Sequence, residues 1–255
     1  MKGSHGVLRL ETARRGKQTV LKDCYFEAPY KVTSPFADPD GSISVIVMYA
    51  SAGILENDTA FVELHAGRDS CVRVTNQSYG KIFKMEQGGA VKDIRISVDK
   101  GARLAFLPKP VIPFAGSRFQ CSTQIEVARG GSLVYRDILS CGRLARGEEF
   151  AFESYRTRLS IRYSGRLVLN ENVVLEPKQQ NLSSLGYYEG FTHQATLCFV
   201  GETVPEAEKA AALLQSVPGI AFGVTSMMLG GLMVRMLGTG AEQLLNACDA
   251  VTALF

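Results

Sequence analysis

Residues 107–149 read LPKPVIPFAGSRFQCSTQIEVARGGSLVYRDILSCGRLARGEE and consist of three unlike parts. A proline-punctuated apolar segment comes first, two short runs typical of β-strands follow, and a charged turn comes last. Glycine and proline are too frequent for a helix, and the apolar residues show no 3.6-residue period. The stretch therefore predicts strands joined by tight turns. Its charged residues at the expected strand edges are Arg118, Arg143, Arg146 and Glu148.

The chain before this stretch follows the same pattern. Runs such as 44–49 and 94–98 tend to alternate apolar and polar residues, as half-buried strands do. Successive runs are about 8–12 residues apart, which is typical of sandwiches, barrels and solenoids. Turns of the form x-G-[RA]-x recur loosely at 66–69, 100–103 and 129–132. This recurrence favours a coiled arrangement of strands.

The chain after this stretch contains more strands and then two helices. Residues 150–175 predict two long strands joined at Ser164-Gly165, and 176–190 predict an exposed loop. A capping box at Thr203–Glu206 and another at Thr239–Glu242 each precede a helical segment. We expect a mainly β protein with about fifteen strands and two α-helices near the C-terminus.

Composition places the chain among globular proteins. Hydrophobic residues make up 46% of the 255 positions, which excludes a disordered chain. No linker divides the sequence, so a single domain spanning residues 1–255 is predicted. The 28 basic and 25 acidic residues give a net charge of +3, which is too balanced to indicate a nucleic-acid partner.

The cysteines and the N-terminal residues indicate a reducing compartment. The six cysteines form no C-x-x-C motif, and residues 1–15 contain no apolar signal segment. We therefore expect free thiols and a cytoplasmic protein. The apolar run at 219–234 has 16 residues, below the roughly 20 that span a bilayer. It predicts two buried strands with a turn at Gly230-Gly231, and no membrane partner.

Motifs of the common enzyme classes are missing. G-x-S-x-G, G-x-x-x-x-G-K-[ST] and G-x-G-x-x-G do not occur, and none of the three histidines adjoins a nucleophile motif. A scaffold or interaction protein is therefore favoured over an enzyme. Scattered carboxylates, including Asp58, Asp137 and Glu148, fit either solvated strand faces or a weak passage for a divalent ion. The arginines of residues 118–146 fit either a network of ion pairs that braces turns or a surface that docks an anionic partner.

Several spaced motifs make the chain resemble the urease accessory protein UreD family, called UreH in some bacteria. The motifs cover nearly the whole sequence and occur in the family's order. They are GVLRL (6–10), RGK (15–17), PYKVTSPF (29–36), SAGILEND (51–58), TNQSYGK (75–81), LPKPVIPF (107–114) and GRLARGE (142–148). Asn57 stands where the family usually has glycine.

The resemblance implies a β-helix-like stack of many short strands with two helices packed on it. It also implies a non-enzymatic role in urease maturation, with UreF, the GTPase UreG and the urease apoprotein as partners. Nickel would pass transiently through an internal tunnel, with no tightly bound cofactor. By similarity, Asp58 and Glu148 are candidates for tunnel-lining carboxylates. Arg118, Arg143 and Arg146 would support turns through ion pairs, and Gly53, Gly142 and Gly147 would provide positive φ.

A second hypothesis is a β-helix enzyme that acts on a polysaccharide. It would use Glu148 with a neighbouring carboxylate as its acid–base pair. The absence of tryptophan and the 9% aromatic content argue against it. A third hypothesis is a structural β protein with no metal path.

Overall fold

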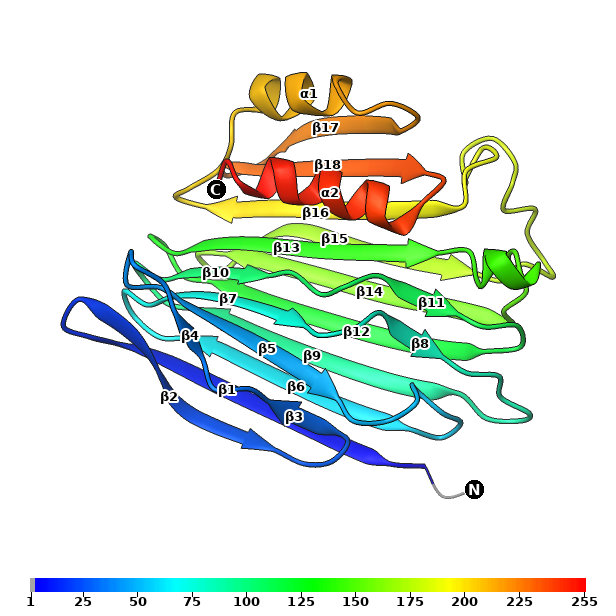
Figure 1. The fold of residues 1–255 in the computed structure, drawn as a ribbon. Coiled ribbons are helices and arrows are strands. Elements are labelled where there is room, and N and C mark those ends of the chain that lie inside the picture. Colours follow the sequence, from blue (N-terminus) through cyan, green and yellow to red (C-terminus); the bar gives the residue numbers. More distant parts are fainter. Residues whose placement is uncertain (1–2) are drawn as a thin grey trace.

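Successive strands pass back and forth between two sheets, which we name sheet A and sheet B (Figure 1). The computed structural model describes residues 3–255. From β5 to β14 the chain alternates between the sheets, and neighbouring strands along this path are parallel. The result is the β-solenoid expected from the strand pattern, with antiparallel strands added at both ends.

Sheet A contains seven strands. In spatial order they are β15 (Arg166–Leu175), β14 (Ser154–Tyr163), β12 (Arg118–Val127), β9 (Ala90–Val98), β6 (Thr59–Ala66), β1 (His5–Arg15) and β2 (Gln18–Phe26). Sheet B forms the other wall. Its main path is β17 (Ala221–Met227), β18 (Gly231–Gly238), β16 (His193–Gly201), β13 (Ser132–Ser140), β10 (Arg103–Phe106), β7 (Cys71–Asn76), β5 (Ile43–Tyr49) and β3 (Tyr30–Val32).

A short third face closes one side of the coil. β8 (Gly80–Ile82) pairs with β11 (Val111–Pro113), and β11 also pairs with the end of β13. Ile54 extends this face through a bridge to Ile82. β4 (Phe36–Ala37) pairs with the first residues of β5, whereas β3 pairs with its last residues. The proline-punctuated segment at the start of residues 107–149 thus forms part of one turn of the solenoid.

The loosely recurring turns of the sequence are the corners of the coil. Each connects a strand of sheet A to the next strand of sheet B. Ala66, Val98 and Val127 are register partners just before these turns. The residues just after them are also register partners. They are Cys71, Arg103 and Ser132.

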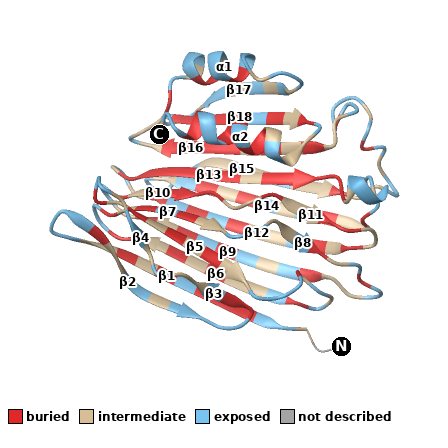
Figure 2. Ribbon diagram, in the orientation of Figure 1, coloured by how far each residue is buried: buried red, intermediate tan, exposed pale blue. Residues whose placement is uncertain are grey.

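Three apolar clusters hold these layers together. One lies between the sheets and includes Leu8, Val62 and Ile125. A second lies between the sheets at the side of the third face and includes Ile82 and Phe152. A third, which includes Phe199, joins sheet B to the helices. Figure 2 shows that β13 is buried along most of its length, whereas β2 and β17 are largely exposed or half-buried.

Both helices cover sheet B but begin later than the capping boxes predicted. α1 (Ala207–Gln215) follows Glu206, and α2 (Ala241–Thr252) follows Gly240, and neither N-cap side chain caps the helix. Pro205 disfavours helical backbone in the residue before it, which delays α1. At α2 the side chain of Gln243, not Glu242, accepts a hydrogen bond from the Thr239 amide, at 3.3 Å.

Other sequence expectations need smaller corrections. Residues 3–255 form eighteen strands rather than about fifteen. The predicted hairpin is present, but β17 is an edge strand of exposed and half-buried residues and only β18 is mostly buried. The turns at Ser164-Gly165 and the loop after β15 lie where the sequence placed them. Neither helix has the length and apolar character to cross a membrane.

Candidate functional site: a polar hollow between the sheets

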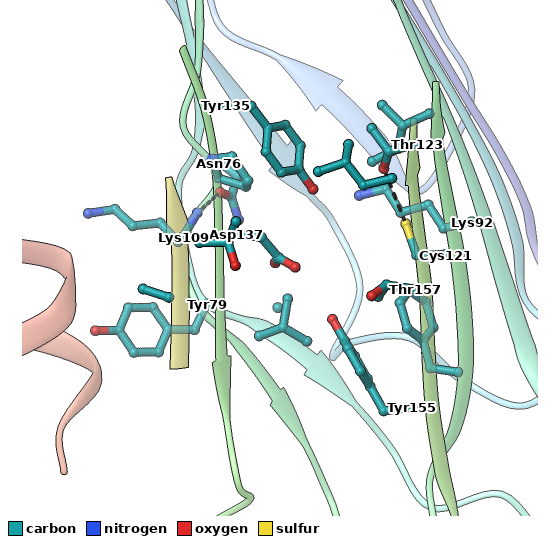
Figure 3. A pocket seen from close by; sticks show the side chains of 18 of the residues that line it. Asn76, Tyr79, Lys92, Lys109, Cys121, Thr123, Tyr135, Asp137, Tyr155 and Thr157 are labelled. Atoms are coloured by element: carbon teal, nitrogen blue, oxygen red, sulfur yellow. Dashed lines mark hydrogen bonds between the residues drawn. The ribbon is translucent and has the colours of Figure 1, made fainter. Parts of the chain in front are cut away.

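The space between the two sheets contains one large hollow of about 650 Å³ (Figure 3). Its walls come from sheet A, sheet B and the third face, and both inter-sheet apolar clusters border it. Exposed residues line it beside β17, at Gly223, and in the turn after β5, at Ser51. Exposed residues therefore line the hollow near opposite edges of sheet B.

One row of polar side chains crosses the wall formed by sheet A. Lys92, Cys121 and Thr157 are register partners on β9, β12 and β14. Register partners in a parallel sheet project from the same face, so all three side chains enter the hollow. Figure 3 shows Lys92 and Cys121 on this wall, with Thr123 one step further along β12. The lysine is the only one of the three that carries a full charge in its ordinary state.

A second row crosses the wall formed by sheet B. Asp137, Thr196 and Arg235 are register partners on β13, β16 and β18. Arg235 forms an ion pair with Glu171 of β15, and this pair joins the two sheets at one side of the hollow. Asp137 forms no ion pair with any residue in 3–255, and Figure 3 shows its carboxylate in the middle of the hollow.

Strand alternation separates Asp137 from the arginine beside it. Arg136 points to the opposite face, where it donates hydrogen bonds to the carbonyl groups of Leu107 and Pro108 at 2.9 and 3.2 Å. It also forms an ion pair with Asp249 of α2 at 2.6 Å. Arg136 thus binds α2 and the carbonyl groups beside it, and it does not neutralise Asp137.

Electrostatics inside the hollow favour neutral groups. Burial raises the pKa of Asp137 to about 6; the Glu171 carboxylate adds to this shift and Lys92 opposes it. Burial raises the pKa of the Cys121 thiol to about 11, so the thiol is protonated at neutral pH. Burial also raises the pKa values of Tyr135 and Tyr155, which present hydroxyl groups. With a pKa of about 6, Asp137 is mostly ionised at neutral pH and is the anionic group in the middle of the hollow (Figure 3).

Lys92 keeps its charge in this setting. Burial acts to lower its pKa, but Tyr30, Cys121 and Asp137 outweigh burial and raise it. Lys92 makes no ion pair with the described residues, so an ammonium and a carboxylate face the same hollow without direct contact. Buried charges without partners are costly, which singles these two groups out.

Asp58 lines the hollow, but its carboxylate is also bound by the backbone around it. Oδ1 accepts hydrogen bonds from the amide and hydroxyl of Ser4 at 2.8 and 2.9 Å, and Oδ2 accepts one from the Leu55 amide at 2.8 Å. These bonds tie the N-terminal strand to the turn before β6. The carboxylate therefore has a structural role at the hollow's edge, whatever else it binds.

Glu148 lies in the turn after β13 and is not among the residues that line the hollow. Arg143 donates to both of its carboxylate oxygens, at 2.8 Å from Nε, and stacks over the Phe114 ring at 4.0 Å. The Arg143 hydrogen bond lowers the pKa of Glu148 against a smaller opposing effect of burial. A carboxylate held ionised in this way does not suit the general acid of a glycosidase.

The other two arginines have different surroundings. Arg118 donates to the Met85 carbonyl at 3.0 Å, and its guanidinium is 3.9 Å from Glu153. Arg146 ends the short 3₁₀ helix η1 (Leu144–Arg146), is exposed, and makes no ion pair within residues 3–255. Of the predicted site residues, the structure thus brings Arg143 and Glu148 into contact. Asp58 lies in a different turn, before β6.

The sequence reasoning missed Lys92, counted Cys121 only among the free thiols, and counted Asp137 only among the scattered carboxylates without choosing it as a candidate. A usable signal was present at Asp137, because an Arg-Asp pair interrupts the apolar strand LVYRDIL. For Lys92 and Cys121 only the register of the coil shows that they share a row. No group of three or more His, Cys, Asp or Glu side chains in residues 3–255 is arranged to hold a metal ion.

Known proteins of one family match this chain almost end to end. The family described as "UreD urease accessory protein" matches residues 4–255. UreD of Acetivibrio thermocellus is 36% identical over 230 residues, which are 89% of this chain and 88% of the relative. UreD of Flavobacterium johnsoniae is 34% identical, covering 90% and 84%, and UreH of Helicobacter pylori strain J99 is 30% identical, covering 92% and 88%.

These names describe a protein that assists urease, so the chain serves an enzyme rather than being one. The hypothesis of a polysaccharide-acting enzyme is therefore wrong. The motifs spaced along the sequence, the solenoid they fold into and the matched relatives agree. The chain belongs to the UreD family of urease accessory proteins, whose members are also named UreH.

Proposed function

We propose that this chain is a cytoplasmic scaffold in urease maturation that helps to deliver nickel to apo-urease. In this proposal it binds UreF and, through UreF, the GTPase UreG, and it docks on the urease apoprotein. Nickel is transient cargo, and no cofactor is held tightly. Membership of the family supports the accessory role. The partners and the cargo follow from the family resemblance.

The observation that supports a path for nickel is the hollow itself. Exposed residues line it near opposite edges of sheet B, and its middle presents one carboxylate, one thiol and several hydroxyl groups. Oxygen ligands bind a partly hydrated divalent cation, but a lone carboxylate binds it weakly. A conduit needs that weakness, because a tight Cys/His site would retain the ion.

The carboxylates have different parts in this proposal. Asp137 is the ligand inside the hollow, and Asp58 stands at its edge. Glu148 together with Arg143 shapes the turn beside the third face. A direct contact between nickel and Glu148 stays a prediction, which the variants described below test.

The proposal is tested by co-expression and by deletion. UreF and UreG homologues from the same source should co-purify with the tagged full chain. Deleting its gene should leave urease synthesised but lacking nickel, measured as metal content and activity of purified urease. Fully active, nickel-loaded urease in the deletion strain would contradict the proposed function.

A further inference from the structure

Lys92 is an unexpected residue inside a path for a divalent cation, because its ammonium repels the cargo. It occupies the central row of sheet A and lines the hollow together with Cys121 and Thr157. Its charge is not used by an ion pair with any described residue. A simple conduit would be served better by a neutral side chain at this position.

Two charged side chains of opposite sign, Lys92 and Asp137, point into the hollow from its facing walls. Arg235 and Glu171 neutralise each other across the gap between the sheets. Lys92 and Asp137 form no such pair and stand on opposite walls (Figure 3), while other charged residues, among them Asp58, Lys81 and Lys109, also line the hollow. The attraction between Lys92 and Asp137 acts through a confined, partly desolvated space, where it is stronger than in bulk water. The lysine therefore compensates the carboxylate without closing the hollow.

A cation that enters must share Asp137 with this ammonium. The long side chain of lysine is a mobile point charge on a flexible stem, so it can withdraw when a second cation approaches and return when that cation leaves. Its repulsion lowers the affinity of the site and its return speeds release. Both effects favour transit over retention.

We propose that Lys92 is an internal counter-cation that competes with the passing metal for Asp137 and thereby keeps metal binding weak. This role rests on the proposed function, because it concerns the same hollow and the same divalent cargo. Lys92 acts on the metal only through Asp137, and it does not ligate the metal itself.

The test measures Ni²⁺ binding to the full-length chain by equilibrium dialysis at neutral pH. Lys92→Met removes the charge and keeps the length of the side chain, and it should raise the affinity for Ni²⁺ at least about tenfold. Lys92→Arg keeps the charge and should bind like the wild type. Adding Asp137→Asn to Lys92→Met should abolish the gain. Arg95→Met, on the exposed face of the same strand, is the matched control for net charge.

Equal Ni²⁺ affinity of wild type and Lys92→Met would overturn the counter-cation role. A gain that Arg95→Met reproduces, or one that survives Asp137→Asn, would overturn it as well. Delivery of nickel to apo-urease by the same variants separates this result from the proposed function. Delivery that Asp137→Asn leaves unchanged argues against Asp137 as a ligand on the path, whereas the affinity comparison alone decides the role of Lys92.

Discussion

Asp137 should make the folded protein less stable at neutral pH than it would be with a neutral side chain. Its pKa in the folded state is about 6, above the usual 3.8, so the folded state binds a proton more tightly than the unfolded chain. As pH rises from about 4 to about 6, ionisation therefore favours unfolding, and the full cost is present above pH 6.

Asp137→Asn is accordingly expected to raise the free energy of unfolding at pH 7.5 by about 2–3 kcal/mol, with the gain disappearing near pH 4. Urea denaturation of both proteins at the two pH values measures the difference. Asp93→Asn, on the exposed outer face of β9, is the control. An equal effect of Asp137→Asn at both pH values would contradict the assignment.

Asp58 combines a structural role with a place at the edge of the hollow. Asp58→Ala leaves the Ser4 and Leu55 amides without their acceptor and should cost about 2–4 kcal/mol of unfolding free energy. If Asp58 and Glu148 also contact nickel, alanine variants that still assemble with partners should deliver less of it to urease. Normal delivery by both assembled variants would remove these two residues from the path.

Backbone conformation explains which glycines could be predicted from the sequence. Gly142 and Gly147 adopt positive φ, as the turn pattern predicted. Gly53 does not; it is needed for space, because a Cβ there would lie 2.5 Å from the Lys81 carbonyl oxygen. Asn57 adopts φ 65°, a conformation that asparagine tolerates better than most residues. The turn before Asp58 therefore forms without the family's usual glycine.

At the scale of elements, the contact between β13 and α2 combines apolar packing with an asymmetric ion pair. The Arg136 side chain is only 3% exposed, whereas that of Asp249 is 54% exposed. Arg136→Ala leaves two carbonyl groups without a donor and should cost about 2–4 kcal/mol of unfolding free energy. Asp249→Ala should cost less, about 1–2 kcal/mol, because Arg136 keeps both carbonyl partners although its buried guanidinium loses its carboxylate.

Chemical denaturation of the two single variants measures this difference. Equal losses, or a larger loss for Asp249→Ala, would contradict the packing described for α2.

Elements with a strong local signal were predictable, whereas their exact ends and partners were not. The hairpin of β14 and β15 followed from strand alternation and the Ser164-Gly165 turn. The start of α2 was misplaced because Glu242, the expected capping residue, instead accepts a hydrogen bond from the Tyr79 hydroxyl far away in the sequence. Such tertiary contacts are invisible in a local window.

At the scale of the whole molecule, the solenoid could be anticipated from recurring turns; an internal tunnel was implied only by the family resemblance, and the residues that line the hollow could not be anticipated. Its rows of polar groups exist because β9, β12 and β14 stack in one register while β13 faces them. Lys92 and Asp137 lie far apart in the sequence, and each looks like an ordinary charged residue in its own strand. Only the coil places both on the walls of the same space.

Passage of nickel through the hollow is tested most directly by filling it. Cys121→Trp places a large ring in the central row, and Gln120→Trp places the same ring on the exposed face of β12. Both variants should fold and bind partners. Nickel content of urease activated with each variant is the measurement. We predict that urease matured with Cys121→Trp lacks most of its nickel, whereas Gln120→Trp supports normal loading; full loading with an assembled Cys121→Trp complex would contradict a path through the hollow.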